Sequence, residues 1–456
     1  MEVGTLQRII NLFKAALVGL NADISLSKLE SLGIMVHKAM TAQARSFHTP
    51  EHIFDLMDET VPILALAALF HDVVYYQVDD GFIPEIGAVL APYVHEEGGQ
   101  LSIVPKPADE DLLLALTLEI FGFEPGKTLI APPGGLNELL SALLMNELLE
   151  GIVSVRDLLK VTSCIEATIP FRGKNERGES PADILCHRLT TINARHDLGM
   201  TAEEIDQTVK WSVTFSNKDV ENFSVPETGE FLDNTWKLLP ETNPSLRLRA
   251  VYSIKSYRIA LQKMEGFLRV LNPENIFNQY RGVPPDGEYQ RMLALAYRNV
   301  ATGREYLGIK LLTAAILEAL ADITGGDAPV ALFTGDVEGD ENCRTLEDFL
   351  PRTQTLPPVS TESTLFGLLA FGRASTSSFD MQNSPLSLFV YKQLDPYAVQ
   401  QLLSAAHDMF EGLCTAEEFL EQVPTFTISS IAEACAVMAV TRSDALCDYA
   451  VLRSSQ

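Results

Sequence analysis

The segment from His52 to Gln77 constrains the fold more than any other, because its apolar residues recur almost continuously at helical spacing as far as His71. Pro62 lies near the expected start of a helix, where proline is tolerated. A helix that is apolar on most of its sides packs inside a protein rather than on its surface. We therefore expect a core of packed helices into which His71 and Asp72 are carried.

Helical patterns recur along most of the chain, whereas patterns typical of strands are sparse. Residues 328–336 are a candidate for a short strand or a loop. Thr201, followed by Glu204, forms a capping-box signature, and Asn137 is the expected N-cap of the helix that follows two glycines. The sequence therefore predicts an all-α fold. Helices are expected over residues 1–20, 30–43, 134–151, 201–223, 243–271 and 288–326.

A length of 456 residues exceeds that of one ordinary domain. We expect a multi-helix N-terminal domain over residues 1–280 and an additional helical domain over residues 281–456. The helical pattern lapses over residues 325–363, which are rich in Gly, Asp, Glu, Thr and Pro, so a loop-rich joint is expected there.

The chain carries 34 basic and 61 acidic residues, a formal net charge of −27. Such a surface repels duplex nucleic acid and anionic membranes. A small anionic substrate would need a metal ion, an arginine or a lysine at its site to reverse the local potential. We therefore expect an anionic substrate to bind only at a site that contains a metal ion or a basic side chain.

Other sequence signals place the protein in the cytoplasm. No apolar run approaches the roughly 20 residues that span a bilayer. The N-terminus lacks the basic start and cleavage site of a secretory signal. The six cysteines form no Cys-x-x-Cys pair, which argues against structural zinc or thioredoxin-like chemistry.

Two of the eight histidines, His48 and His52, stand four residues apart in "RSFHTPEHI". On a helix this spacing places both rings on one face, where they can share a metal site or divide the roles of ligand and proton donor. Further on, His71 and Asp72 follow an apolar helix. Burying an aspartate is costly unless a charge compensates it, and Zn²⁺, Fe²⁺ or Mn²⁺ suits a His/Asp set better than Ca²⁺.

The His-Asp dipeptide alone is a weak signal, because it occurs twice more, at residues 196–197 and 407–408. Neither of these has a second histidine upstream at helical spacing. We interpret both as structural or surface pairs.

The stretches "RSFHTPEHI" and "ALFHDVVYYQ", with a weaker echo in "NELLSALL", resemble the HD superfamily of metal-dependent phosphohydrolases. The resemblance implies that His52, His71 and Asp72 bind one or two divalent ions (Mn, Fe, Zn or Mg). It also implies that His48 protonates the leaving oxygen. A further ligand is expected from a distant aspartate, for which Asp219 is the first choice, ahead of Asp206 and Asp183.

Other residues near the motif have open roles. Arg45 is expected either to bind a phosphate oxygen or to form an ion pair with Asp55 or Glu51. Tyr75 and Tyr76 line the pocket or pack in the core. Glu138 either supports the metal or is favoured by the helix dipole in a first turn.

The resemblance implies hydrolysis of a small phosphoester, such as a nucleotide or a cyclic nucleotide. The alternative is a catalytically inactive HD-fold protein that senses a ligand or serves as a protein-interaction scaffold. The C-terminal half is the expected place of a protein partner or of self-association.

Overall fold

The computed structural model is built mainly from α-helices, which confirms the expected all-α class. Among the residues that it describes, the only sheet is a two-stranded antiparallel one. None of the described helices is both long and apolar enough to cross a membrane. The described residues are 4–104, 106, 110–124, 126–127, 134–247, 251–335, 344–352, 361–377 and 379–455.

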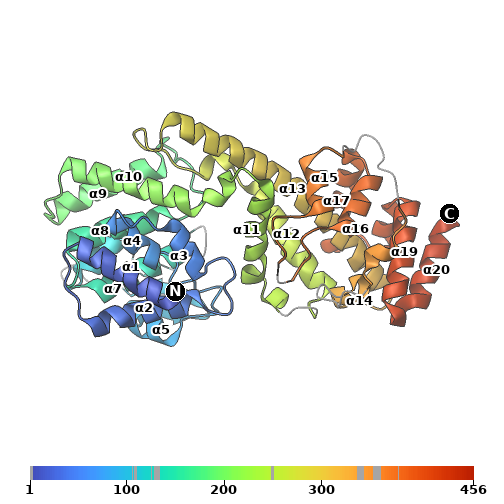
Figure 1. Cartoon of the computed structure of the whole chain (residues 1–456), viewed down its shortest axis with the longest axis horizontal. Helices are drawn as coiled ribbons and strands as arrows, with labels where there is room; N and C mark the ends of the chain where they lie inside the picture. The colour runs from blue at the N-terminus through green and yellow to red at the C-terminus, as the bar shows by residue number, and fades with distance from the viewer. Residues whose placement is uncertain are drawn as a thin grey trace. The chain divides into compact units, whose positions relative to one another are not determined.

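The chain divides into two compact units, coloured from blue to red along the chain in Figure 1. Unit 1 comprises residues 1–224 and 272–296, and unit 2 comprises residues 225–271 and 297–456. This division differs from the expected boundary at residue 280, because residues 225–271 belong to unit 2. Helical periodicity shows that a helix has an apolar face, but it does not show which other helix covers that face.

The first unit holds helices α1 to α10, the strands β1 and β2, and the start of α13. Their bounds are α1 Thr5–Gly19, α2 Leu26–Met40, α3 Pro50–Leu56, α4 Pro62–Phe70, α5 Pro84–Leu90, β1 Val94–Glu97, β2 Gln100–Ile103, α6 Leu112–Phe121, α7 Leu136–Leu149, α8 Val155–Ala167, α9 Pro181–Arg195 and α10 Ala202–Asp219. The short 3₁₀ helices η1 (Glu221–Ser224) and η3 (Pro273–Asn275) complete it.

Helix α4 lies in the middle of this unit, because every one of its residues after Pro62 is buried. It packs against α1, α3, α7 and α8. Phe70 near its end meets Phe13 of α1 edge to face, with ring centroids 5.4 Å apart. The apolar sequence of α4 thus explains both its burial and the position of His71, which caps its C-terminal end.

The region before α4 differs from the expected continuous helix, since α3 ends at Leu56 and α4 begins with Pro62. Proline at the first helical position needs no hydrogen-bond partner for its nitrogen, so both Pro50 and Pro62 start helices. Thr49 is extended, as expected for a residue that precedes proline. His48 therefore lies in a bend outside α3, and the expected placement of both histidines on one helix is wrong.

The capping box of Thr201 and Glu204 is confirmed at the start of α10. The expected N-cap of α7 is wrong: Gly135, with a φ of 80°, takes that place, and Asn137 lies inside the first turn. A positive φ suits glycine, which has no Cβ. The side chain of Asn137 is thereby free to bind another part of the chain.

The second unit holds α11 to α20, together with η2, η4 and η5. Their bounds are α11 Thr228–Thr242, η2 Pro244–Arg247, α12 Ile254–Val270, α13 Asp286–Ile323, α14 Val330–Thr334, η4 Leu346–Phe349, α15 Thr364–Phe371, α16 Pro385–Gln393, α17 Pro396–Phe410, α18 Ala416–Gln422, α19 Thr425–Met438, η5 Val440–Arg442 and α20 Ser443–Ser454. The first residues of α13, up to Ala296, belong to unit 1.

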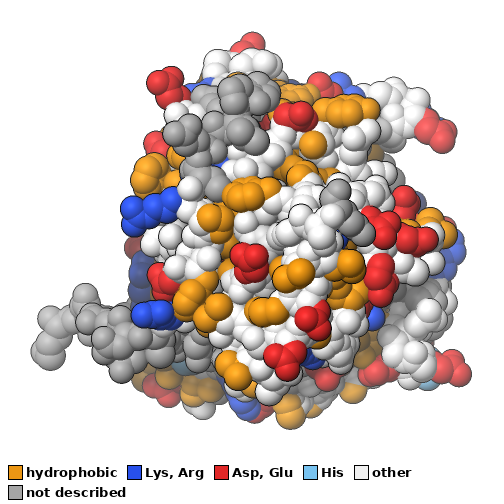
Figure 2. Space-filling model, turned by 90° about the vertical axis from the view of Figure 1, so that its right-hand side faces the viewer, with side chains coloured by type: hydrophobic (Ala, Val, Ile, Leu, Met, Phe, Trp, Pro, Cys, Tyr) orange, Lys and Arg blue, Asp and Glu red, His pale blue; other side chains and the backbone are white. Residues whose placement is uncertain are grey.

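Two segments of this unit were expected to be a short strand or loop and a loop-rich joint. Residues 330–334 form the short helix α14 rather than a strand. Of the expected joint at 325–363, residues 336–343 and 353–360 lie outside the described part of the chain. On the side where α19 and α20 lie in Figure 1, hydrophobic side chains are interspersed with acidic and basic ones (Figure 2).

Candidate metal centre

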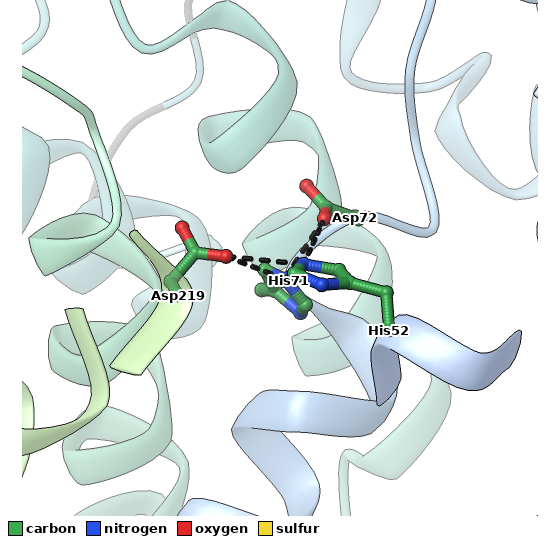
Figure 3. Close-up of side chains that lie close together, drawn as sticks. All are labelled: His52, His71, Asp72 and Asp219. Atoms are coloured by element: carbon green, nitrogen blue, oxygen red, sulfur yellow. Dashed lines mark hydrogen bonds and ion pairs between the residues drawn. The ribbon is translucent and has the colours of Figure 1, made fainter. Parts of the chain in front are cut away.

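Four side chains from distant parts of unit 1 converge on one point (Figure 3). His52 comes from α3, His71 and Asp72 from the C-terminal end of α4, and Asp219 is the last residue of α10. One ligand atom from each residue lies within 4.8 Å of the others. The structure thus brings together the four residues expected as metal ligands, although they span 167 positions of the chain.

The distances fit a single ion. The Nε2 atom of His52 lies 3.1 Å from Asp219 Oδ1 and 3.4 Å from Asp72 Oδ2. The Nε2 atom of His71 lies 2.8 Å from Asp72 Oδ2, 3.6 Å from Asp219 Oδ1 and 3.3 Å from His52 Nε2. Ligand atoms about 2.1 Å from one ion stand about 3.0–3.4 Å from each other in octahedral or tetrahedral geometry. Two nitrogens and two oxygens match Zn²⁺, Fe²⁺ or Mn²⁺.

Neighbouring groups fix the orientation of the two rings. The Nδ1 atom of His71 lies 3.1 Å from the carbonyl oxygen of Ala68, so an Nδ1–H donor leaves Nε2 free to act as a ligand. Phe215 meets the His71 ring edge to face, with centroids 5.5 Å apart, and Phe47 packs beside His52. The imidazoles are therefore held with their Nε2 atoms toward the same point.

Electrostatic coupling within the cluster is strong. Burial favours the neutral form of His52, but Asp219 and Asp72 outweigh it and raise the pKa of His52 to about 9. The pKa of His71 is likewise raised well above its ordinary value, because Asp72 and Asp219 overcome the effect of burial. Burial acts to raise the pKa of both carboxyls, yet the imidazoles keep the pKa of Asp72 and Asp219 low.

Without a metal ion, the two carboxylates therefore favour protons on the rings that face them. One divalent cation would replace the two ring protons without changing the net charge, since ligating imidazoles must be neutral. The residues present fit such an ion in donor type, spacing and charge.

Helix α7 forms hydrogen bonds with the chain directly after Asp72, and these contacts were not predicted from the sequence. The Oγ of Ser141 accepts a hydrogen bond of 3.1 Å from the backbone N–H of Val74, and the Oδ1 of Asn137 accepts one of 3.2 Å from that of Tyr76. Asn137 and Ser141 stand four residues apart, so they share one face of α7. Their spacing in "NELLSALL" could be read from the sequence, but the segment that they bind could not.

Glu138, between these two in the sequence, is a further buried carboxyl, whose pKa is affected by the charges of Asp72 and Asp219. Its Oε2 is buried without a hydrogen-bond partner among the described residues. Burial raises the pKa of Glu138 to about 7, opposed by a backbone hydrogen bond and reinforced by the charges of Asp72 and Asp219. A carboxyl that titrates near neutrality can both accept and donate a proton.

His48 lies beside the cluster rather than in it. Its Nε2 is 4.0 Å from Asp72 Oδ2, and its ring meets that of Tyr75 edge to face at 4.5 Å. Tyr75 thus lies against the site. Tyr76 does not: its ring packs on Phe82, and its hydroxyl donates to a carboxylate oxygen of Glu96 on β1.

The expectation for Arg45 needs correction. Its side chain is fully buried and forms an ion pair with Asp79, not with Asp55 or Glu51. Burial excludes direct contact between its guanidinium and a substrate in this conformation. The expectation that Arg45 binds a phosphate oxygen is therefore not supported by the fold.

The residues held as alternatives lie elsewhere. Asp206 forms ion pairs with Lys210 and Arg281, and Asp183 closes the capping box of α9. His196, of the second His-Asp dipeptide, lies 3.1 Å from Glu119. None of these belongs to the cluster of four.

Comparison of the chain with family models, with curated proteins and with solved structures finds no match. The functional interpretation of the cluster therefore depends on its own geometry and chemistry.

Proposed function

We propose that unit 1 binds a divalent transition-metal ion through His52, His71, Asp72 and Asp219, and that it hydrolyses a small phosphoester as HD-type phosphohydrolases do. What carries the proposal is the convergence of two imidazole nitrogens and two carboxylate oxygens on one point, with His71 buried and the other three side chains partly exposed. A cluster of this composition is more typical of a metal site than of a structural ion pair, because its cations are titratable and can be displaced.

The chemistry divides between the ion and the protein. A bound divalent ion would lower the pKa of a water molecule and offset negative charge on the phosphoryl group. His48 is close enough to Asp72 to reach a leaving group at the site, and an imidazole has the intrinsic pKa to protonate that oxygen. Glu138, a buried carboxyl whose Oε2 has no hydrogen-bond partner among the described residues, would accept the proton of the attacking water.

Charge favours a small phosphorylated substrate over a polyanion. The chain carries a net charge of −27, so a long anion would be repelled outside the site. We assign to the ion the attraction of one phosphoryl group, in a nucleotide or cyclic nucleotide.

Metal analysis of protein purified without chelator tests the proposal. We expect about one equivalent of Mn, Fe or Zn, and hydrolysis of at least one member of a panel of nucleotides, cyclic nucleotides and nitrophenyl phosphates. The double variant His71→Ala/Asp72→Ala should lose both. The matched control is His407→Ala/Asp408→Ala, which removes the same dipeptide from α17 in unit 2.

Other outcomes discriminate between functions. If wild-type protein holds no transition metal after purification and reconstitution, the proposal is wrong. If it binds metal and a nucleotide but hydrolyses nothing on the panel, the non-catalytic alternative of a ligand-sensing HD-fold protein replaces it.

A further inference from the structure

Arg45 is the most completely bonded side chain near the candidate metal centre. Its Nε and Nη2 donate to the two carboxylate oxygens of Asp79, at 3.0 and 2.5 Å. Its Nη1 donates to the carbonyl oxygen of Asp72 at 2.7 Å and contacts the sulfur of Met40, and Nη2 also donates to the carbonyl oxygen of Val73 at 3.1 Å. A guanidinium has five N–H donors, so every donor has a partner here.

The partners of Arg45 show which segment of the chain its guanidinium holds in place. Asp72 and Val73 directly follow α4, whereas Asp79 ends a turn in which its N–H binds the carbonyl oxygen of Tyr75. Arg45 therefore joins the beginning and the end of residues 72–79. We name this stretch the ligand turn, since it begins with the expected ligand Asp72.

The ligand turn is held from two sides. On one side, the side chains of Ser141 and Asn137 accept hydrogen bonds from the N–H groups of Val74 and Tyr76. On the other, Arg45 donates to the carbonyl oxygens of Asp72 and Val73. Arg45 thus binds the carbonyl oxygens at the start of the turn, including that of the ligand residue Asp72, whereas α7 binds the N–H groups that follow.

We propose that Arg45, with Asp79, is a positioning residue that fixes the backbone of Asp72 and thereby aims its carboxylate at the metal. This inference rests on the proposed function, because it assigns Arg45 a role toward the metal ligand. The arginine next to the histidine motif acts through the protein and not on the substrate. Its two-pronged geometry explains why a lysine cannot replace it, since an ammonium cannot bind Asp79 and two carbonyls in one plane.

Titration of Mn²⁺ into full-length Arg45→Lys, Asp79→Asn and wild-type protein tests the inference. Groups that orient a metal ligand typically change affinity by about 10–100-fold, so both variants should bind Mn²⁺ about 10–100-fold more weakly. Asp79→Asn preserves shape and removes the charge, so it reports on the pair if Arg45→Lys fails to fold.

Arg258→Lys is the matched control, in unit 2. Arg258 also forms a buried two-pronged ion pair, with distances of 2.6 and 2.9 Å to Glu318. A purely structural role for Arg45 would make all three variants less stable and leave Mn²⁺ affinity unchanged. We expect Arg258→Lys to stay within about twofold of wild type.

The outcomes separate this inference from the proposed reaction. Unchanged Mn²⁺ affinity in folded Arg45→Lys and Asp79→Asn overturns the positioning role, whatever the activity. A raised KM with unchanged Mn²⁺ affinity also overturns it and points to substrate contact. Wild-type protein that binds Mn²⁺ but hydrolyses no phosphoester overturns the reaction, while weakened binding in the two variants still supports the positioning role.

Discussion

Each unit contains a buried cluster of charged side chains, and the two are built differently. In unit 1, Asp72 and Asp219 face two histidines. In unit 2, Asp380 accepts hydrogen bonds from Lys310 at 2.7 Å, Trp236 at 2.8 Å and Tyr257 at 3.1 Å. Arg373 approaches the same oxygen to 3.6 Å.

The difference lies in what neutralises the carboxylate. Burial acts to raise the pKa of Asp380, but the neighbouring Lys310 and Arg373 keep it low. Lysine and arginine are not the usual ligands of a metal ion, so an ion would not replace them and the cluster belongs to the scaffold. The unit 1 carboxylates are instead paired with imidazole rings, whose protons a metal ion can displace. Buried acids alone therefore do not indicate a metal site. A metal site is indicated when the positive charge that balances them can be exchanged for a metal ion.

The largest effect is expected for Asp219→Ala. Loss of one of four ligands should remove the bound metal on purification and reduce hydrolysis to background, because the remaining three donors leave the ion weakly held. Elemental analysis measures the first effect, and a phosphoester assay the second. Asp206→Ala on the same helix is the control, and full metal content in Asp219→Ala would contradict the assigned ligand set.

His48→Gln should separate catalysis from metal binding. Loss of a general acid typically slows a reaction by about 10²–10⁴-fold, so kcat should fall by this amount. His48 is not among the four ligands, and metal content should stay at the wild-type level. A variant with kcat within about threefold of wild type would remove His48 from the mechanism.

Asp380→Ala should affect stability without affecting the metal. It leaves Lys310 buried without its counter-charge and Arg373 with Asp233 alone, at 3.4 Å, and breaking a buried pair in this way typically costs about 3–5 kcal/mol of unfolding free energy. Urea unfolding measures the loss, and elemental analysis should find the wild-type metal content. If the metal is lost from a folded variant, the two clusters are not independent.

The pH dependence of stability should differ between the units in chelator-treated protein. The raised pKa of His52 contributes stability that is complete below its ordinary value of 6.5 and is lost as the pH rises to about 9. The lowered pKa values of Asp72, Asp219 and Asp380 contribute stability that is lost only as the pH falls below about 3.8. Between pH 6.5 and 9, unit 1 should weaken and unit 2 should not.

The two tryptophans of the chain allow this measurement, since Trp211 lies in unit 1 and Trp236 in unit 2. Fluorescence-monitored urea unfolding of Trp236→Phe reports unit 1, and that of Trp211→Phe reports unit 2. Added metal should reverse the trend in unit 1, because its binding displaces ring protons and strengthens with pH. Equal slopes in the two variants would contradict the comparison.

Several features followed from local sequence. The apolar run before His71 predicts a buried helix, and the Thr201–Glu204 box predicts the start of α10. Asp219 was the first choice for a further ligand because the family resemblance implies a distant aspartate and this one follows a capped helix of suitable length. The buried helix and the start of α10 depend on residues close together in the chain, so periodicity and capping rules suffice for them.

Other features depend on contacts between distant segments. The pairing of Arg45 with Asp79 joins residues 34 positions apart, and acids nearer in sequence were equally good candidates. Pro50 starts α3 and thereby leaves His48 outside the helix, a local effect that the four-residue spacing obscured. The assignment of residues 225–271 to unit 2 depends on which apolar faces meet, and periodicity does not specify partners.

The position of Asp219 at the end of α10 has a consequence for synthesis of the protein. His52 and Asp219 lie 167 positions apart, so an ion that binds both closes a long loop whose ends folding must first bring together. A nascent chain that has not yet left the ribosome as far as residue 219 offers only three ligands. Stable capture of the ion would thus require that residues 52–219, which carry all four ligands, have been made and have come together.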